Sequence, residues 1–326
     1  MSDNNEHDGQ ASPLQTPALA ENDSQPERLF HPPQPGMEIW HQNKLYTIGE
    51  PINRGNFGAI YACSDEWGNQ LVAKVLVPRN QSYEEVRSRW LDEADKLLHL
   101  RHPNTTYIYD ICEHRDTFYI IMERCEWTLH DIITATPNYD GSVWFMPIAR
   151  CILQAIHFMH RHGYVHKDLH HKNIFTSLIP NELVRTHPPA MVFKVGDFGI
   201  SRLEGDIDPI NTILAQWMLP PESLAPQEFG HIGRVTDIYH MGLLFLSIIE
   251  GQIREFSREE ILDGVPRQIA EGLDSPYSRA IAKALRRHTA DRTRTALEFW
   301  RDLNSSFRTD QSASTLSMSS MTSSKR

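Results

Sequence analysis

The sequence predicts an α+β fold with two lobes, a small β-rich lobe followed by a larger helical lobe. Residues 46–50, 59–64 and 70–77 are short apolar stretches separated by Gly and Asn, which is typical of strands. Farther along the chain, apolar side chains recur at helical spacing over residues 143–162 and 234–250. Because strands come first and helices later, we expect two lobes around a cleft.

The other expected elements follow the same division. The first half should contain a helix at 83–100 and strands at 108–113 and 118–123, and the second half should contain helices at 257–263, 275–288 and 293–303. The segment from Asn173 to Asp197 contains Pro180, Pro188 and Pro189, and we expect it to be a surface loop.

Composition limits the classes of function. The chain has 326 residues, of which 40% are hydrophobic, so it can bury a sizeable core. Its net charge of −10 leaves no basic field for nucleic acid or an anionic membrane. The longest apolar stretch, 241–249, is too short to span a bilayer. Four dispersed cysteines indicate reduced thiols and predict an intracellular, cytoplasmic protein. No feature of the sequence specifies an oligomeric state.

Both ends of the chain have the composition of disordered segments. Residues 1–30 contain six acidic residues and one basic residue, and few of them are apolar. Residues 305–326 contain 12 Ser or Thr among 22 residues. The sequence therefore predicts tails at 1–37 and 305–326, with the folded part at 38–304.

A glycine-containing loop and a lysine occur in the predicted strand region. Gly55 and Gly58 lie between two strands, where glycine lets a backbone approach phosphate oxygens, although an ordinary hairpin has the same pattern. Lys74 lies among apolar strand residues, so its amine needs either a partner or a path to water. Glu93, in the predicted helix, is a candidate partner; alternatively, it is a solvated helix charge.

A polar cluster in the second half has residue types that suit a divalent cation and proton transfer. Asp168 and Asn173 lie in a loop between apolar anchors, and Asp197 follows an apolar strand. Asn173 and Asp197 supply the oxygen ligands that Mg²⁺ prefers. Asp168 is then the carboxylate that can accept a hydroxyl proton or orient the nucleophile.

The order of these motifs resembles that of the eukaryotic-type protein kinase family over about residues 45–303. The matching segments are the loop 53–60, Val72-Ala73-Lys74, Glu93, Arg101-His102-Pro103-Asn104, Ile121–Cys125, His166–Asn173, Asp197-Phe198-Gly199, Pro220-Pro221-Glu222 and Asp237–Gly242. The resemblance implies the kinase fold, with an N-lobe at about 38–124 and a C-lobe at about 125–304. It also implies ATP and Mg²⁺ as cofactors and a protein as substrate.

The resemblance also implies a role for each matching residue. Gly55 and Gly58 would cover the phosphates of ATP, and Lys74, held by Glu93, would contact the α- and β-phosphates. Four apolar residues would enclose adenine: Ile52, Ile60, Ala73 and Phe175. Met122 would be the gatekeeper, and Glu123 and Cys125 would form hydrogen bonds to the base through their backbones. For transfer, Asp168 would be the base, Asn173 and Asp197 would bind Mg²⁺, and Lys172 would steady the γ-phosphate. Asp237 would anchor the catalytic loop, and Glu222 would pair with either Arg292 or Arg294.

Several positions depart from the family pattern. Asn53 replaces the first glycine of the loop, and His170 replaces a lysine usual in Ser/Thr kinases. Lys172 lies where tyrosine kinases often carry arginine. Lys167 replaces the arginine that grips an activation-loop phosphate, and a lysine lacks the planar fork. We therefore expect activity without a phosphate in the segment 197–222.

Candidate residues in that segment are few. Ser201 and Thr212 are its expected phosphate acceptors, and Asp206 or Asp208 could pair permanently with Lys167 in place of a phosphate.

Four functions fit these motifs. The favoured one is an active protein Ser/Thr kinase; the others are a tyrosine or dual-specificity kinase, a pseudokinase scaffold that binds ATP weakly, and a small-molecule kinase. The scaffold is disfavoured because Lys74, Asp168, Asn173 and Asp197 are all present. Aminoglycoside and choline kinases share the Asp168-Leu169-His170-x-x-Asn173 pattern, but they usually lack the segment Asp197-Phe198-Gly199.

Overall fold

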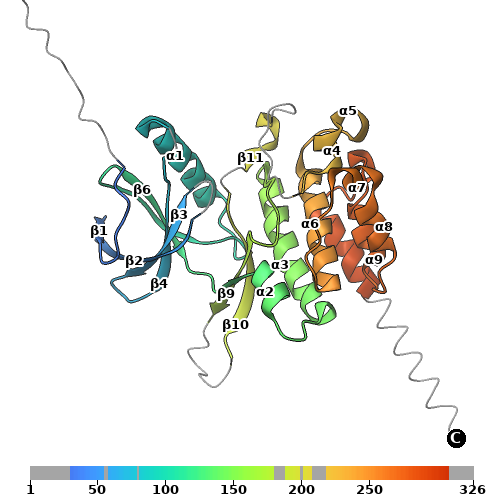
Figure 1. Cartoon of the computed structure of the whole chain (residues 1–326), viewed down its shortest axis with the longest axis horizontal. Coiled ribbons are helices and arrows are strands. Elements are labelled where there is room, and N and C mark those ends of the chain that lie inside the picture. The colour runs from blue at the N-terminus through green and yellow to red at the C-terminus, as the bar shows by residue number, and fades with distance from the viewer. Residues whose placement is uncertain are drawn as a thin grey trace, which may run out of the picture.

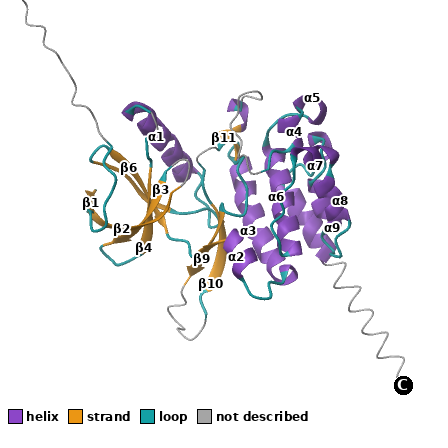
Figure 2. Cartoon of the chain, viewed as in Figure 1, coloured by secondary structure: helices purple, strands orange, loops and turns teal. Residues whose placement is uncertain are grey.

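The chain forms two lobes (Figure 1). The structure, a computed structural model, describes residues 30–54, 58–78, 81–179, 188–198, 201–207 and 218–307. Most strands lie in the lobe nearer the N-terminus, and most helices lie in the other lobe (Figure 2). This division confirms the predicted α+β class and its two-lobed, kinase-like arrangement.

The smaller lobe is an antiparallel sheet with one helix against it. Its strand order is β1-β2-β3-β4-β6-β5. The strands are β1 (Glu38–His41), β2 (Lys44–Arg54), β3 (Ala59–Asp65), β4 (Gln70–Val75), β5 (Ile108–His114) and β6 (Thr117–Glu123). Helix α1 (Tyr83–His99) begins after Ser82, because the Ser82 hydroxyl accepts a hydrogen bond from the Glu85 backbone N–H. The Trp90 indole N–H donates to the Tyr119 carbonyl at 3.0 Å, which fixes α1 on the sheet.

Helices form most of the larger lobe, with α3 (Gly141–Arg161) and α6 (Arg234–Glu250) at its centre. The rings of Phe145 and Phe245 meet between them, 5.4 Å apart. Helix α6 ends at Gly251, whose φ of +66° suits glycine. The other helical elements are α2 (Leu129–Ala135), α4 (Pro221–Leu224), α5 (Pro226–Phe229), α7 (Arg258–Asp263), α8 (Val265–Glu271), α9 (Ser278–Ala284), a helix over residues 296–307, and the short turns η1 (Glu204–Asp206) and η2 (Thr289–Asp291).

The expected surface loop between Asn173 and Asp197 is wrong at both of its ends. Strand β9 (Ile174–Ile179) pairs antiparallel with β10 (Ala190–Val195), and β9 also pairs with β7 (Trp127–Thr128). The described residues Pro188 and Pro189 precede β10, so they do not interrupt the ladder. A second small pair joins β8 (Tyr164–Val165) to β11 (Arg202–Leu203).

The folded part extends beyond both expected boundaries. At the N-terminal end, residues 30–37 belong to the small lobe, because His31 exchanges two hydrogen bonds with the Thr117 side chain at 3.1 and 2.9 Å. At the other end, residues 305–307 continue the last helix, and the Phe307 ring stacks on Tyr277. The rest of both expected tails lies outside the described residues.

Among the described helices, α3 alone has the length and apolar composition that a membrane span requires. It lies at the centre of the larger lobe in Figure 1, and its buried residues, including Phe145 and Ile152, belong to the core of that lobe. A core helix of this kind passes the same test of length and composition.

Candidate active site

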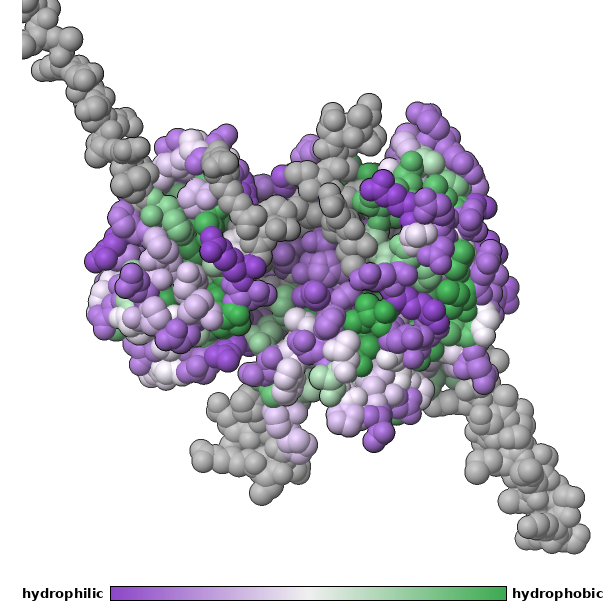
Figure 3. All heavy atoms as spheres, viewed as in Figure 1, coloured by the Kyte–Doolittle hydropathy of each residue, from purple (hydrophilic) through white to green (hydrophobic). Residues whose placement is uncertain are grey.

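The predicted site residues converge between the lobes. Strand β4 and helix α1 contribute Lys74 and Glu93 from the small lobe, and the loop 166–173 and Asp197 come from the other side. Figure 3 shows a hollow between the lobes with hydrophilic side chains on its surface.

Lys74 joins the two lobes through two carboxylates. Its amine Nζ lies 2.5 Å from Glu93 Oε1 and 3.2 Å from Asp197 Oδ1. Lys74 and Glu93 are both buried, so the alternatives of a solvated helix charge and a lysine reaching to water are wrong. Burial alone would lower the pKa of Lys74, but the charges of Asp197 and Glu93 outweigh it and raise that pKa. The amine is therefore a fixed positive charge between Glu93 and Asp197.

Asp237 of α6 supports the loop that carries Asp168. It is fully buried, and it accepts hydrogen bonds from the backbone N–H groups of His166 and Lys167, both at 2.9 Å. His160 Nε2 lies 2.8 Å from the same carboxylate. Burial would raise the pKa of Asp237, but the hydrogen bonds and charges of His160 and His166 hold it below its ordinary value. A buried, ionised carboxylate thus fixes the backbone of the loop.

A chain of hydrogen bonds links this loop to the residue before Asp197. Asn173 Nδ2 donates to the Asp168 carbonyl at 2.9 Å, and the Gly196 N–H donates to the Asn173 carbonyl at 3.0 Å. His166 Nε2 lies 3.1 Å from the Gly196 carbonyl. Asp168, Asn173 and Asp197 are therefore held as one unit, as expected for residues that must act together.

The donor groups fit a divalent cation. Because Asn173 uses its amide nitrogen within the loop, its amide oxygen is left for a ligand, and the Asp197 carboxylate is 36% exposed. Two protein oxygens suit Mg²⁺, which keeps waters and substrate phosphates in its other positions. Asp197 has a φ of +61°, a strained conformation typical of residues held for function.

The Asp168 carboxylate is placed to accept a proton. Its Oδ1 is buried and has no hydrogen bond within the described part of the chain. His170 Nε2 lies 3.2 Å from this oxygen, close enough for attraction when the imidazole is charged. Lys172, two residues before the start of β9, is exposed on the same loop.

Three histidines cluster beside this loop. The ring of His171 lies 5.0 Å from that of His130 and 5.8 Å from that of His170. Burial, together with His170 and His130, lowers the pKa of His171 to about 4, so its ring is neutral at physiological pH. Among the described residues, no group of three His, Cys, Asp or Glu side chains is placed to hold a metal ion.

The residues expected around adenine lie along adjacent strands. Ala73 on β4 is fully buried and pairs with Tyr61 and Ile121 on the neighbouring strands. The other expected residues in the described ranges are partly buried, except that Ile52 is exposed: Ile60, Met122, Glu123, Cys125 and Phe175. A Cβ on Gly58 would lie 2.5 Å from the Val75 carbonyl, so a side chain is excluded there. Gly55 lies outside the described residues.

The structure selects Arg292 over Arg294 as the partner of Glu222. Arg292 donates to both carboxylate oxygens, at 2.8 and 2.6 Å, and both side chains are fully buried. Arg294 is exposed. This pair joins α4, at the end of the activation segment (residues 197–222), to the turn after η2.

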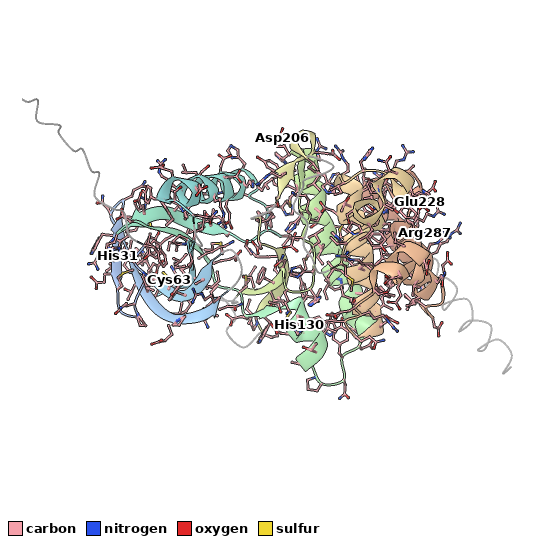
Figure 4. All side chains as sticks on the ribbon, turned by 45° about the horizontal axis from the view of Figure 1, so that its top comes forward. His31, Cys63, His130, Asp206, Glu228 and Arg287 are labelled. Atoms are coloured by element: carbon pink, nitrogen blue, oxygen red, sulfur yellow. The ribbon has the colours of Figure 1, made fainter. Side chains whose placement is uncertain are left out.

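The structure describes two of the four residues expected to act in the activation segment, Ser201 and Asp206. Ser201 was expected to accept phosphate, but it is fully buried and its hydroxyl lies 3.4 Å from the His166 carbonyl, so a kinase could not reach it in this fold. Asp206 is exposed beside β11, at the upper edge of Figure 4. Asp208 and Thr212 lie outside the described residues.

Sequence reasoning missed three charged residues near this segment: Asp92 and Lys96 of α1, and Arg202 of β11. Arg202 NH1 lies 3.1 Å from Asp92 Oδ2, and Lys96 Nζ lies 2.7 Å from the same oxygen. The only local signal was the i, i+4 spacing of Asp92 and Lys96. The contact with Arg202 spans 110 positions and has no local signal.

Comparison with known proteins gives a family match and several relatives. Residues 46–303 match the protein kinase domain. The chain is 26% identical over 210 residues to cyclin-dependent kinase-like 4 of Mus musculus, which covers 64% of this chain and 56% of that protein. It is 27% identical over 247 residues to serine/threonine-protein kinase TAO2 of Rattus norvegicus, covering 74% of this chain and 18% of that protein.

A plant relative gives a similar result. Calcium-dependent protein kinase 8 of Arabidopsis thaliana is 26% identical over 215 residues, covering 64% of this chain and 37% of that protein. The chain thus spans between 18% and 56% of the length of these relatives. Because the family match covers well over half of the chain and the site has the geometry described above, the chain belongs to the protein kinase family.

Proposed function

We propose that this protein transfers the γ-phosphate of ATP to Ser or Thr hydroxyls of protein substrates. The observation that carries the proposal is the contact of Lys74 with both Glu93 and Asp197, at 2.5 and 3.2 Å. This contact aligns the small lobe with the residues of the larger lobe that would hold the nucleotide. Phosphoryl transfer asks the protein mainly to position groups and neutralise charge.

Each residue has a proposed task in the transfer. Lys74, held by Glu93, neutralises the phosphates next to the bond that breaks. Asp168 accepts the proton of the attacking hydroxyl as the new bond to phosphorus forms. Asn173 and Asp197 would hold Mg²⁺, which, when bound, shields the negative charge of the phosphates. Asp237 keeps the backbone of the loop in place.

The proposed specificity for Ser and Thr hydroxyls rests on the relatives. Serine/threonine-protein kinase TAO2 carries this specificity in its name. Lys172 favours the alternative, a tyrosine or dual-specificity kinase, because tyrosine kinases often carry a basic residue at its position. We also propose an intracellular location, since all four cysteines are free thiols.

Phosphoamino-acid analysis tests the proposal. The purified protein is incubated with labelled ATP, Mg²⁺ and a panel of protein and sugar-amine acceptors, and labelled proteins are hydrolysed in acid. We expect label on phosphoserine and phosphothreonine. Label on phosphotyrosine alone would support the alternative specificity, and label on the sugar-amines alone would indicate a small-molecule kinase.

A matched variant shows whether the label comes from this site. Asp168→Asn keeps the size of the side chain but removes the proton acceptor, so transfer should fall by about 100-fold or more. Equal labelling by the variant and the parent would mean that another protein in the preparation is responsible.

A further inference from the structure

Two adjacent acidic residues of α1 have partners in opposite lobes. Glu93 is buried and contacts Lys74 of the small-lobe sheet. Asp92, the preceding residue, is half exposed and contacts Arg202, which belongs to β11. Successive residues of a helix point about 100° apart, so one turn of α1 can reach both partners. One orientation of α1 therefore allows both contacts, that of Asp92 with Arg202 and that of Glu93 with Lys74.

Arg202 lies in the part of the larger lobe that leads into the catalytic loop. It pairs in register with Val165 of β8, and the next residue, His166, begins the loop that carries Asp168. Arg202 NH1 also donates to the Ser201 carbonyl at 3.0 Å, which fixes its guanidinium against its own strand. The carboxylate of Asp92 thus joins α1 to a strand pair that is continuous with the catalytic loop.

The Asp92 carboxylate lies between cationic side chains that would otherwise repel one another and displace α1. Lys96 is buried, with 3% exposed, and its Nζ contacts Asp92 Oδ2 at 2.7 Å. Lys167 is also buried, and burial together with the charges of Arg202 and Lys96 lowers its pKa. Lys96 and Arg202 thus both contact Asp92, and the charges of both act on Lys167. Without that carboxylate, repulsion between Lys96 and Arg202 would favour a displaced α1.

We propose that Asp92 is a positioning residue, whose carboxylate bridges Lys96 and Arg202 and so holds α1 in the orientation in which Glu93 reaches Lys74. We name this contact the Asp92 bridge, after Asp92, Lys96 and Arg202. The carboxylate supplies an anion between the cationic groups of Lys96 and Arg202. The expected effect of the Asp92 bridge on turnover rests on the proposed function. Its expected effect on the position of α1 rests on the geometry alone.

The test compares Asp92→Asn with Asp95→Asn. Asp95 lies on the same helix and is also exposed, but its partner is His99 within the helix, so it controls for loss of an acidic residue. Amide hydrogen exchange is measured over 83–99 and 202–207 in both variants and the parent. We expect faster exchange at both segments in Asp92→Asn alone, because the variant loses the tie between them.

Turnover provides the second readout. Exposed ion pairs contribute little individually, so we expect kcat/KM for ATP to fall about fivefold in Asp92→Asn, equivalent to about 1 kcal/mol, and to stay within twofold in Asp95→Asn. Asp92→Glu, which keeps the charge, should recover most of the loss. KM for the protein acceptor should not change, because the bridge acts on α1.

Anion rescue separates the bridge from a general structural role. Inorganic sulfate should partly restore kcat/KM in Asp92→Asn by binding between Lys96 and Arg202, whereas sodium chloride of equal ionic strength should not. Because sulfate also stabilises folded proteins in general, the unfolding midpoint of the variant is measured in the same salts. Recovery of kcat/KM that only follows a rise in that midpoint, or equal recovery in both salts, would overturn the proposal.

The outcomes distinguish the two proposals. If the parent transfers no phosphate, the proposed function fails, and the exchange comparison still decides the bridge. If Asp92→Asn and Asp95→Asn show the same exchange over 83–99, the bridge does not position α1 and the inference is wrong, whatever the turnover of the parent.

Discussion

Lys167 is almost completely buried, with 2% of its surface exposed, although lysine is usually found in water. Its backbone N–H is held by Asp237, and its φ is +69°. Burial, with the charges of Arg202 and Lys96, lowers the pKa of its amine to about 8. The sequence identified the replacement of arginine at this position, but it could not show burial, which depends on elements from both lobes.

The first prediction concerns the pH dependence of stability at Lys167. The pKa is lower in the folded state than its ordinary value of 10.5. Below pH 8 the amine is charged in both states and folding bears the cost of burying it. Between pH 8 and 10.5 the unfolded chain binds more protons, so this cost disappears as the pH rises. Lys167→Met should therefore be more stable than the parent by up to about 3 kcal/mol at pH 7, and this advantage should shrink toward pH 10.5.

Chemical denaturation across this pH range checks the prediction. Comparing the two proteins at each pH cancels the titration of tyrosines and cysteines that both contain. A difference in the free energy of unfolding that stays constant from pH 7 to 10.5 would show that Lys167 has an ordinary pKa.

At the scale of elements, the pair between Glu222 and Arg292 ties α4 to the turn that follows η2. Arg292 also lies 4.8 Å above the ring of Tyr239 of α6, so three separate elements meet at one guanidinium. The motif around Glu222 predicted an arginine partner, but two arginines only two positions apart were equally suitable by sequence. Which one turns inward depends on the local backbone after η2, and that has no sequence signal.

The second prediction uses these two arginines as matched positions. Arg292→Met leaves the buried Glu222 carboxylate without its partner, so the free energy of unfolding should fall by about 3–5 kcal/mol. Arg294→Met changes an exposed side chain and should cost less than about 0.5 kcal/mol. Thermal and denaturant unfolding of both variants checks this. Equal losses would mean that Arg292 is not the buried partner.

Elements with clear periodicity were predictable, whereas several short ones were not, although the short helix α7 (Arg258–Asp263) was expected at 257–263. Helices α1 and α6, for example, follow from the helical spacing of their apolar side chains. Helices α2, α4, α5 and α8 have at most seven residues, too few for a periodic pattern. Strand β9 was hidden because Pro180 and its neighbours suggested a loop, and pairing with β7 and β10 overrides that local signal.

The third prediction concerns the activation segment. Thr212→Ala should keep kcat within about threefold of the parent, a change of about 0.6 kcal/mol, because Lys167 cannot grip a phosphate bidentately. The Asp92 carboxylate already supplies an anion beside Lys96 and Arg202, whose charges act on Lys167. Steady-state kinetics on both proteins checks this. A hundredfold loss in the variant, with the parent further activated by thiophosphorylation, would show that a phosphate switch exists.

At the scale of the whole molecule, the site depends on contacts between lobes that no sequence pattern reports. Residue types and order were sufficient to predict Lys74, Asp168, Asn173 and Asp197, because each lies in a recognisable local motif. Glu93 lies in no motif of its own, and the sequence left it as either a partner of Lys74 or a solvated helix charge. The contact of Asp92 with Arg202 was not predictable, because it depends on how α1 sits over β11 after both lobes have folded. Domain limits failed for the same reason, since His31 and Phe307 are fixed by residues far along the chain.

The fourth prediction tests those limits. A fragment of residues 30–307 should unfold at the same temperature as the full chain. A fragment of 38–304 loses the contacts of Phe30, His31 and Phe307, and its Tm should be lower by about 5 °C. Calorimetry of the two fragments and the parent measures this. Equal Tm values for the two fragments would mean that the added residues contribute nothing to the fold.

The account of the site is tested most directly by turnover in Lys74→Met and Asp197→Asn. Both residues serve the nucleotide and its cation in this account, and neither belongs to the apolar core. Labelled-phosphate transfer to a protein acceptor is measured for both variants and the parent, with circular dichroism as the check on folding. We predict that transfer falls by about 1,000-fold in each variant while the spectra match that of the parent. Parental turnover in either variant would contradict the central claim that these residues form the active site of a working protein kinase.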